Sequence, residues 1–222
     1  MKIIGHRGAR GLAPENTIAS LRKGLEHHVD ELEFDLHVTK DGVVILNHDR
    51  NVHDAAGNNL SIATHAYQEL KAHKPDLATF QDVLDQIGRQ VTLHAEVKKN
   101  VPIEPIVKII KAQLQNDWVE QDFLLASSNQ KTLRDLHREL PAIQKVVIEK
   151  WSGIRATRRA KQVNTKRLSM NQRWLWWGFI AAMHRGGYEL YGYTLNNPRK
   201  AQRWAKYGFS GPITDYPDRF EK

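Results

Sequence analysis

The strongest constraint on the fold of this chain is a regular alternation of short apolar runs with longer amphipathic runs. A strand followed by a helix, repeated several times, predicts a parallel sheet, because each helix carries the chain back to the same end of the sheet. About seven or eight such strands are expected, which favours a TIM (β/α)8 barrel over an open sheet. The predicted strands are 2–5, 32–38, 91–98, 123–127, 143–148, 188–195 and 211–217, and the predicted helices are 80–87, 104–114, 129–140, 176–185 and 197–207, with an earlier helix opened by residues 14–17.

The length of 222 residues predicts a single domain with a full hydrophobic core. Asp41-Gly42 separates the strand at 32–38 from a second strand-like run at 43–49, and this pattern predicts a hairpin. Residues 50–78 are polar and follow no regular period. We therefore expect one barrel domain over residues 1–222, with a small insertion at about 41–78 after the second barrel strand.

Two absences narrow the class of protein. The chain has no cysteine, which excludes disulfides, thiolate metal ligands and cysteine nucleophiles. No apolar run reaches the roughly eighteen residues that a transmembrane helix needs. The first residues enter a strand at once and show no signal-peptide pattern, so we expect a cytoplasmic protein.

The formal charge of +8 favours anionic partners in general, and most of it comes from one segment. Residues 150–188 contain nine Lys or Arg and no Asp or Glu, and the run Trp174-Leu175-Trp176-Trp177-Gly178-Phe179 lies within them. Aromatic residues beside arginines are typical of a membrane-surface or single-strand nucleic-acid contact. The alternative, which we favour, is that the tryptophans pack the start of a barrel helix and the basic residues form a solvated face. We expect no nucleic-acid partner and at most a weak membrane contact.

The strand at 32–38 carries the chemistry that stands out most. Read with a period of two, it places Glu33, Asp35 and His37 on the face opposite to its apolar residues. Two carboxylates this close raise each other's pKa unless a cation shares them, and a hard divalent metal is the usual cation. A charged, solvated face on an antiparallel strand is the simpler interpretation of such a pair.

On the barrel interpretation, further polar residues fall at or near strand ends, where barrel enzymes hold their active sites. These residues are His6, Glu33, Asp35, His48, Glu96, Lys98 and Thr194.

Several motifs together resemble the glycerophosphodiester phosphodiesterase family, and the resemblance covers nearly the whole chain. The N-terminal motifs match in order and spacing; they are His6-Arg7-Gly8, Pro14-Glu15-Asn16-Thr17, Glu33-Phe34-Asp35, Thr39-Lys40-Asp41-Gly42 and His48-Asp49. Weaker matches follow at Glu96-Val97-Lys98, Ser127, Tyr193-Thr194-Leu195-Asn196 and Ile213-Thr214-Asp215-Tyr216-Pro217.

This resemblance implies a TIM barrel that hydrolyses a small-molecule glycerophosphodiester to sn-glycerol 3-phosphate and an alcohol. It implies a divalent metal on Glu33, Asp35 and Glu96, and three carboxylates without a thiol favour Mg²⁺ or Ca²⁺, with Mn²⁺ as a further choice. It implies acid–base catalysis by His6 and His48, in either order.

Three more residues are candidates for contact with the substrate. Arg7 could bind the phosphate through two parallel hydrogen bonds, and Lys98 could add a point charge from the face that Glu96 shares. Tyr193 stands where the family has Trp and would form one wall of the pocket. Glu15 and Asn16 could either support the His6 loop or touch the substrate, and Asp215 could simply order the last loop.

One departure from the family leaves a second function open. Residues 50–57 read Arg-Asn-Val-His-Asp-Ala-Ala-Gly, where the family has a threonine-rich loop, so the leaving alcohol could differ. A lysophospholipase D-type enzyme acting on membrane lysophospholipids is therefore the alternative function. A non-catalytic binding protein is disfavoured, because a binder needs neither paired histidines nor three metal-ligating carboxylates.

Overall fold

The structure is a computed structural model that describes residues 1–54 and 56–220. Within these residues, eight parallel strands form a closed barrel, because β1 pairs with both β11 and β2. The predicted TIM barrel is thus confirmed. The barrel strands are β1 (Ile4–Gly5), β2 (Glu31–Val38), β6 (Thr92–Val97), β7 (Phe123–Ser127), β8 (Gln144–Glu149), β9 (Arg167–Asn171), β10 (Glu189–Tyr193) and β11 (Gly211–Thr214).

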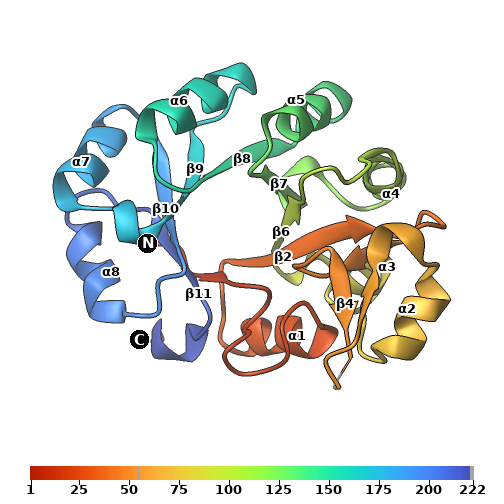
Figure 1. Ribbon diagram of the computed structural model, residues 1–222. Helices are drawn as coiled ribbons and strands as arrows, with labels where there is room; N and C mark the ends of the chain where they lie inside the picture. Colours follow the sequence, from red (N-terminus) through yellow and green to blue (C-terminus); the bar gives the residue numbers. More distant parts are fainter. Residues whose placement is uncertain (55, 221–222) are drawn as a thin grey trace.

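Helices surround the barrel in chain order, as Figure 1 shows. Most begin at a side chain that accepts a hydrogen bond from the first turn, which satisfies a backbone N–H that the helix itself leaves unpaired. Asn129, predicted to cap its helix, does so by accepting from the backbone N–H of Thr132. The helices are α1 (Ile18–Glu26), α3 (Phe80–Gln86), α4 (Glu104–Leu114), α5 (Gln130–Glu139), α6 (Gly153–Gln162), α7 (Trp177–Arg185) and α8 (Pro198–Ala205). Among the described helices, none combines the length and the apolar composition needed to cross a bilayer.

Between β2 and α3 the chain builds a small lobe outside the ring of helices (Figure 1). The predicted hairpin is present: β3 (Val44–Leu46) runs antiparallel to β2. The segment after it is more regular than its sequence indicated, because β4 (Asn51–His53) pairs with β5 (Asn59–Ser61) and α2 (Tyr67–His73) follows. The lobe has its own apolar cluster, made by Ile45, Val52, Ile62, Leu70 and Leu77. Of the loop at 50–57, Ala55 lies outside the described residues.

The largest departure from the predicted elements is in the basic segment. The pattern indicated one helix there, at 176–185, and this helix is present as α7. The structure also contains α6 and the sixth barrel strand, β9, ahead of it. The sequence pattern does not predict this strand, because Arg167, Ser169 and Asn171 occupy alternate positions. Only Leu168 and Met170 provide an apolar signal.

Of the favoured interpretation of this segment, the solvated basic face is confirmed for seven of the nine Lys or Arg, which are exposed, whereas the packing of the tryptophans is wrong. Arg159 and Arg167 are buried, because they form ion pairs with Glu149 and Glu31. Trp174 and Trp176, by contrast, are more than half exposed.

Candidate active site

Three carboxylates meet at the centre of the barrel. In β2, Glu33 and Asp35 face inward, while Phe34 and the other apolar residues of the strand pack outward in the core. The parallel register sets Asp35 opposite Glu96 of β6, and one carboxylate oxygen from each of the three acids lies within 4.8 Å of the other two. The antiparallel, solvated alternative is wrong, since β2 runs parallel to β1 and β6 and all its residues are buried.

Two cations partly balance this negative charge. Lys98 Nζ lies 2.6 Å from Asp35 Oδ1 and 3.0 Å from Glu96 Oε2, and Arg7 Nε lies 3.3 Å from Asp35 Oδ2. Burial by itself would raise the pKa of Asp35, but Lys98 and Arg7 outweigh it and hold this pKa at about 2.

The other two acids remain undercompensated. Burial, together with Asp35, raises the pKa of Glu96 to about 7 despite the opposing effect of Lys98. Burial and the charges of Asp35 and Glu96 also raise the pKa of Glu33 well above its ordinary value. The raised pKa values show that the cluster lacks enough positive charge. Because it offers only oxygen donors, it fits a hard divalent cation such as Mg²⁺ or Ca²⁺.

The loop after β1 brings His6 and Arg7 to these carboxylates. Gly8 allows the tight turn: its φ is +86°, and a Cβ there would lie 2.5 Å from the carbonyl carbon of Ser20 in α1. The backbone N–H of Arg7 donates to Glu33 Oε2 at 2.8 Å, and that of Gly8 donates to the Glu33 carbonyl oxygen at 3.0 Å. The loop is therefore fixed to the strand that carries two of the three acids.

Closure of the barrel provides a partner for His6 that the sequence analysis did not recognise. β1 and β11 pair with Gly5 beside Thr214, so the next residues, His6 and Asp215, meet at the strand ends, with His6 Nδ1 2.6 Å from Asp215 Oδ1. Burial lowers the pKa of His6, and the hydrogen bond to Asp215 opposes part of that effect. Asn196 donates to the second Asp215 oxygen at 2.9 Å. The available signal was the position of Asp215 near the carboxyl end of the last predicted strand, 211–217, where barrel enzymes hold their active sites.

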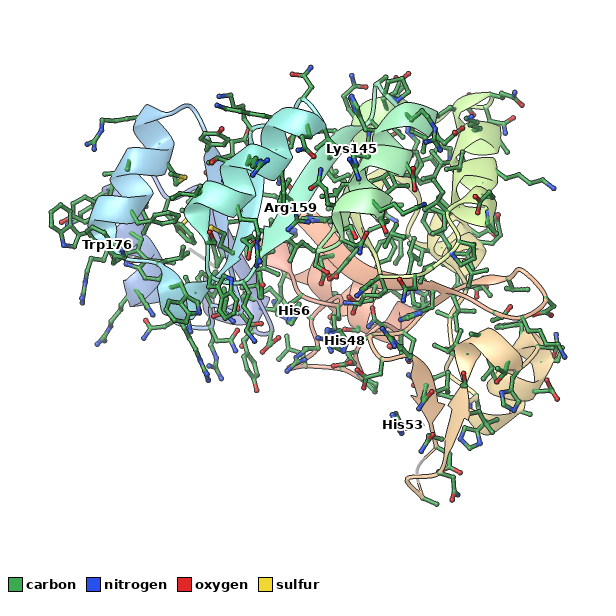
Figure 2. All side chains as sticks on the ribbon, turned by 45° about the horizontal axis from the view of Figure 1, so that its top comes forward. His6, His48, His53, Lys145, Arg159 and Trp176 are labelled. Carbon is green, nitrogen blue, oxygen red and sulfur yellow. The ribbon has the colours of Figure 1, made fainter. Side chains whose placement is uncertain are left out.

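His48 approaches the same centre from the other side. It follows β3, and its Nδ1 lies 2.8 Å from Asp49 Oδ1. His48 is more exposed than His6, but both line an inner cavity of about 100 Å³. Figure 2 shows the two histidines near each other in the middle of the molecule, with His53 far out on the insertion. The structure thus brings the two predicted acid–base residues together.

An outer cavity of about 440 Å³ adjoins the inner one, and both are lined by His48, Glu96 and Tyr193. The predicted substrate contacts divide between them: Arg7 lines the inner cavity and Lys98 the outer one. Tyr193 forms part of the wall of both. Its hydroxyl donates to the Glu149 carbonyl oxygen at 3.3 Å, and burial raises its pKa to about 12, so the phenol is neutral.

The residues whose roles were left open bind protein groups. Glu15 Oε1 accepts from Arg7 Nη1 at 2.6 Å, which fixes the guanidinium beside the acids. Asn16 donates from Nδ2 to Asp35 Oδ2 at 2.9 Å and accepts from the Asp35 backbone N–H at 3.0 Å. Both side chains therefore support the site.

Comparison with known proteins agrees with this geometry. The model of the Glycerophosphoryl diester phosphodiesterase family matches residues 6–219. A glycerophosphodiester phosphodiesterase of Bacillus altitudinis is 24% identical over 237 residues, which covers 100% of this chain and 97% of the relative. A human lysophospholipase D is 36% identical over 108 residues, which covers 47% of this chain and 34% of the relative.

Solved structures agree on the fold. A phosphodiesterase of Oleispira antarctica, solved in complex with the product sn-glycerol 3-phosphate, superposes with a TM-score of 0.85 at 21% identity, covering 99% of this chain and 95% of that one. With the family model spanning almost every residue from the His6 loop to the last turn, the chain belongs to the glycerophosphoryl diester phosphodiesterase family and is an enzyme of that class.

Proposed function

We propose that this protein hydrolyses glycerophosphodiesters to sn-glycerol 3-phosphate and an alcohol, with the help of a divalent metal. The observation that carries the proposal is the meeting of two histidines and three carboxylates at one cavity. The activity for which the Bacillus altitudinis relative is named and the product bound to the Oleispira antarctica structure support the same substrate class.

Glu33, Asp35 and Glu96 would hold the metal, which would neutralise charge on the non-bridging phosphate oxygens. Arg7 lies beside these acids in a fixed orientation, because Glu15 and Asp35 hold its guanidinium. Lys98 extends the positive charge toward the outer cavity. The chain's own residues thus orient the anionic diester with its leaving alcohol toward the larger, outer space.

His6 suits the role of base. Its lowered pKa keeps the imidazole neutral near pH 7, and Asp215 favours the proton on Nδ1, which leaves Nε2 to accept one. The base would take the proton of the glycerol 2-hydroxyl as that oxygen bonds to phosphorus. As the bond from phosphorus to the alcohol breaks, His48 would give its proton to the leaving oxygen. Water would then open the cyclic phosphate, with the two histidines exchanging roles.

Turnover of glycerophosphocholine tests the proposal, with release of glycerol 3-phosphate as the readout and Mg²⁺, Ca²⁺ or EDTA present in parallel. Removing a positioned acid or base costs about 10²–10⁴-fold in rate, so we expect His6→Ala and His48→Ala each to lose at least about 100-fold. His53→Ala is the matched control, since His53 is exposed on the insertion. Turnover that is unaffected by EDTA, or equal in His48→Ala and His53→Ala, would refute the mechanism.

A lysophospholipase D-type activity is the second candidate. It is favoured by the likeness of part of the chain to a human enzyme of that name and by an exposed aromatic surface described below. Parallel assays with lysophosphatidylcholine and glycerophosphocholine separate the two candidates. Preference for the lysolipid would replace the soluble diester as the substrate while keeping the same residues at the centre.

A further inference from the structure

Four of the six tryptophans lie exposed on one side of the barrel, and none of them lines the inner or the outer cavity of the site. With one isoleucine they form a surface that we call the tryptophan rim. Its members and their exposed fractions are Trp151 (56%), Ile154 (85%), Trp174 (54%), Trp176 (57%) and Trp177 (61%). The other two tryptophans are packed: Trp204 is buried, and Trp118 stacks on Phe123.

The tryptophan rim lies on the same end of the barrel as the active site. Trp151 follows the end of β8 and Ile154 lies in the first turn of α6, while Trp174 and Trp176 follow the end of β9. The strands are parallel, so these connections belong to the carboxyl-end face, which also carries His6 and His48. Figure 2 shows Trp176 at the α7 edge of the molecule, to the side of the two histidines. A flat body that touched the rim would lie beside the mouth of the site.

Two of the exposed rings, Trp176 and Trp177, pack against neighbouring residues. Trp176 lies so close over Gly178 that a Cβ there would come within 2.1 Å of its six-membered ring. Trp177 stands edge-to-face against Trp176, with ring centroids 5.9 Å apart, and its other neighbour Tyr207 lies at 5.8 Å. Indoles that already pack against neighbours on one side lose less conformational entropy when their exposed side enters a new environment.

The charge around the tryptophan rim is positive. Residues 150–214 contain thirteen Lys or Arg and a single acidic residue, Glu189. Some of this charge is internal, since Arg159 and Arg167 are buried in ion pairs. Lys150 and Arg173 remain exposed next to the aromatic residues of the rim. The surface therefore joins apolar rings to a cationic border.

We propose that the tryptophan rim docks the enzyme on the surface of an anionic phospholipid bilayer, with the active site facing the lipid. Indole rings favour the polar–apolar boundary of a bilayer, and lysines and arginines are drawn to anionic headgroups. This docking goes beyond the proposed hydrolysis and does not depend on it.

A single-stranded nucleic acid is the other polyanion to consider, and the geometry disfavours it. Base stacking needs an open ring face. Trp176 packs closely against Gly178, and Trp177 has two aromatic neighbours, so neither ring is fully open for stacking. Ile154, the most exposed apolar side chain of the rim, has no ring to stack but can enter an acyl layer.

Vesicle binding tests this proposal. The full chain is sedimented with vesicles of phosphatidylcholine and phosphatidylglycerol in equal parts and with vesicles of pure phosphatidylcholine, and tryptophan fluorescence is followed with lipids brominated on the acyl chain. We expect the protein to bind the mixed vesicles and its tryptophan fluorescence to be quenched by the bromine. Binding should be at least about tenfold weaker to vesicles without the anionic lipid, and it should weaken as salt is added.

Two variants locate the contact. Trp176→Ser with Trp177→Ser alters the α7 part of the rim, and Ile154→Ser alters the α6 part, where the side chain is too exposed to support the fold. We expect the first to weaken vesicle binding about tenfold or more and the second by several-fold, with turnover of glycerophosphocholine unchanged. Val119→Ser is the matched control, because Val119 is 41% exposed but precedes β7 at the opposite end of the barrel.

Three outcomes would contradict the proposal. No binding or quenching by the wild type, equal binding by the Val119 and Trp176 variants, or binding to a single-stranded oligonucleotide in place of vesicles would exclude lipid docking through this surface. Loss of the proposed hydrolysis would look different, because vesicle binding would persist without turnover.

Discussion

The Nδ1 atom of His6 lies 2.6 Å from Oδ1 of Asp215, although 209 positions separate the two residues. They meet because the first and last strands of the barrel are neighbours, with Gly5 in register with Thr214. Asn196 and Arg10 both contact the Asp215 carboxylate, at 2.9 Å in each case, so its orientation is fixed. The closure of the barrel thus determines which ring nitrogen of His6 can face a substrate.

Asp215→Asn should therefore impair catalysis without removing any group that touches the substrate. We expect kcat to fall about 100-fold, since an amide no longer holds the proton on Nδ1. Because the Asp215 hydrogen bond and charge raise the pKa of His6 against the effect of burial, their loss should lower that pKa further. The acid limb of kcat/KM should shift to lower pH, which a pH–rate profile measures.

Asp117→Asn serves as its control, because Asp117 is an exposed carboxylate far along the chain from both strands. An Asp215→Asn enzyme with an unshifted pH profile would mean that Asp215 acts only on the fold.

Removing one carboxylate from the centre should abolish the stabilisation of the protein by metal. In EDTA, Glu33→Gln should melt at the same temperature or a few degrees higher than the wild type, because the pKa of Glu33 is raised by burial and by neighbouring acids, so its charge is unfavourable there. Added Mg²⁺ should raise the Tm of the wild type by a few degrees and leave the variant unchanged.

Calorimetry with and without Mg²⁺ measures both effects, and Glu26→Gln, at an exposed position on α1, is the control. An equal rise in Tm for Glu33→Gln and the wild type would place the metal elsewhere.

Substitutions of Tyr193 should separate its ring from its hydroxyl. The ring lines both cavities, whereas the hydroxyl points to the Glu149 carbonyl oxygen. Tyr193→Phe should keep kcat/KM within about threefold, since one neutral hydrogen bond to the backbone is lost. Tyr193→Ala should lower kcat/KM at least about tenfold by widening the pocket. Steady-state kinetics on one diester decides, and equal losses in both variants would assign the hydroxyl a direct role.

Below the active site, a buried ion-pair cluster should govern acid stability. Glu31 accepts from His94 Nδ1 at 3.2 Å, and it pairs with Arg167 and with Lys2. Although burial opposes it, the contacts with His94, Arg167 and Lys2 lower the pKa of Glu31 to about 2. This carboxylate therefore adds to the free energy of unfolding above pH 4.5, and its contribution is lost as the pH falls toward 2.

Burial also lowers the pKa of His94, so protonation of this residue in the unfolded state acts in the same direction below pH 6.5. Glu31→Gln should lower the free energy of unfolding at pH 7 by about 2–4 kcal/mol and flatten its fall between pH 5 and 2. Urea titrations across that range measure both changes, and a variant with the acid limb of the wild type would assign acid sensitivity to other groups.

How far the sequence predicts this protein depends on the element. The parallel strands of the barrel and their helices follow from period and turn signals, because a buried strand between amphipathic helices leaves a strong local pattern. β9 lacks that pattern: its Arg167 is a buried partner of Glu31, 136 positions away, and only the closed barrel brings the two together.

The same division holds for the site and its surroundings. The sequence by itself determined the carboxylates of β2 and the two histidines, because strand alternation and motif spacing are local properties of the chain. Only the tertiary structure decided that Asp215 orients His6 and that the tryptophans face outward. Both depend on which strand ends and loops become neighbours, and barrel closure sets those contacts between residues that are remote in sequence.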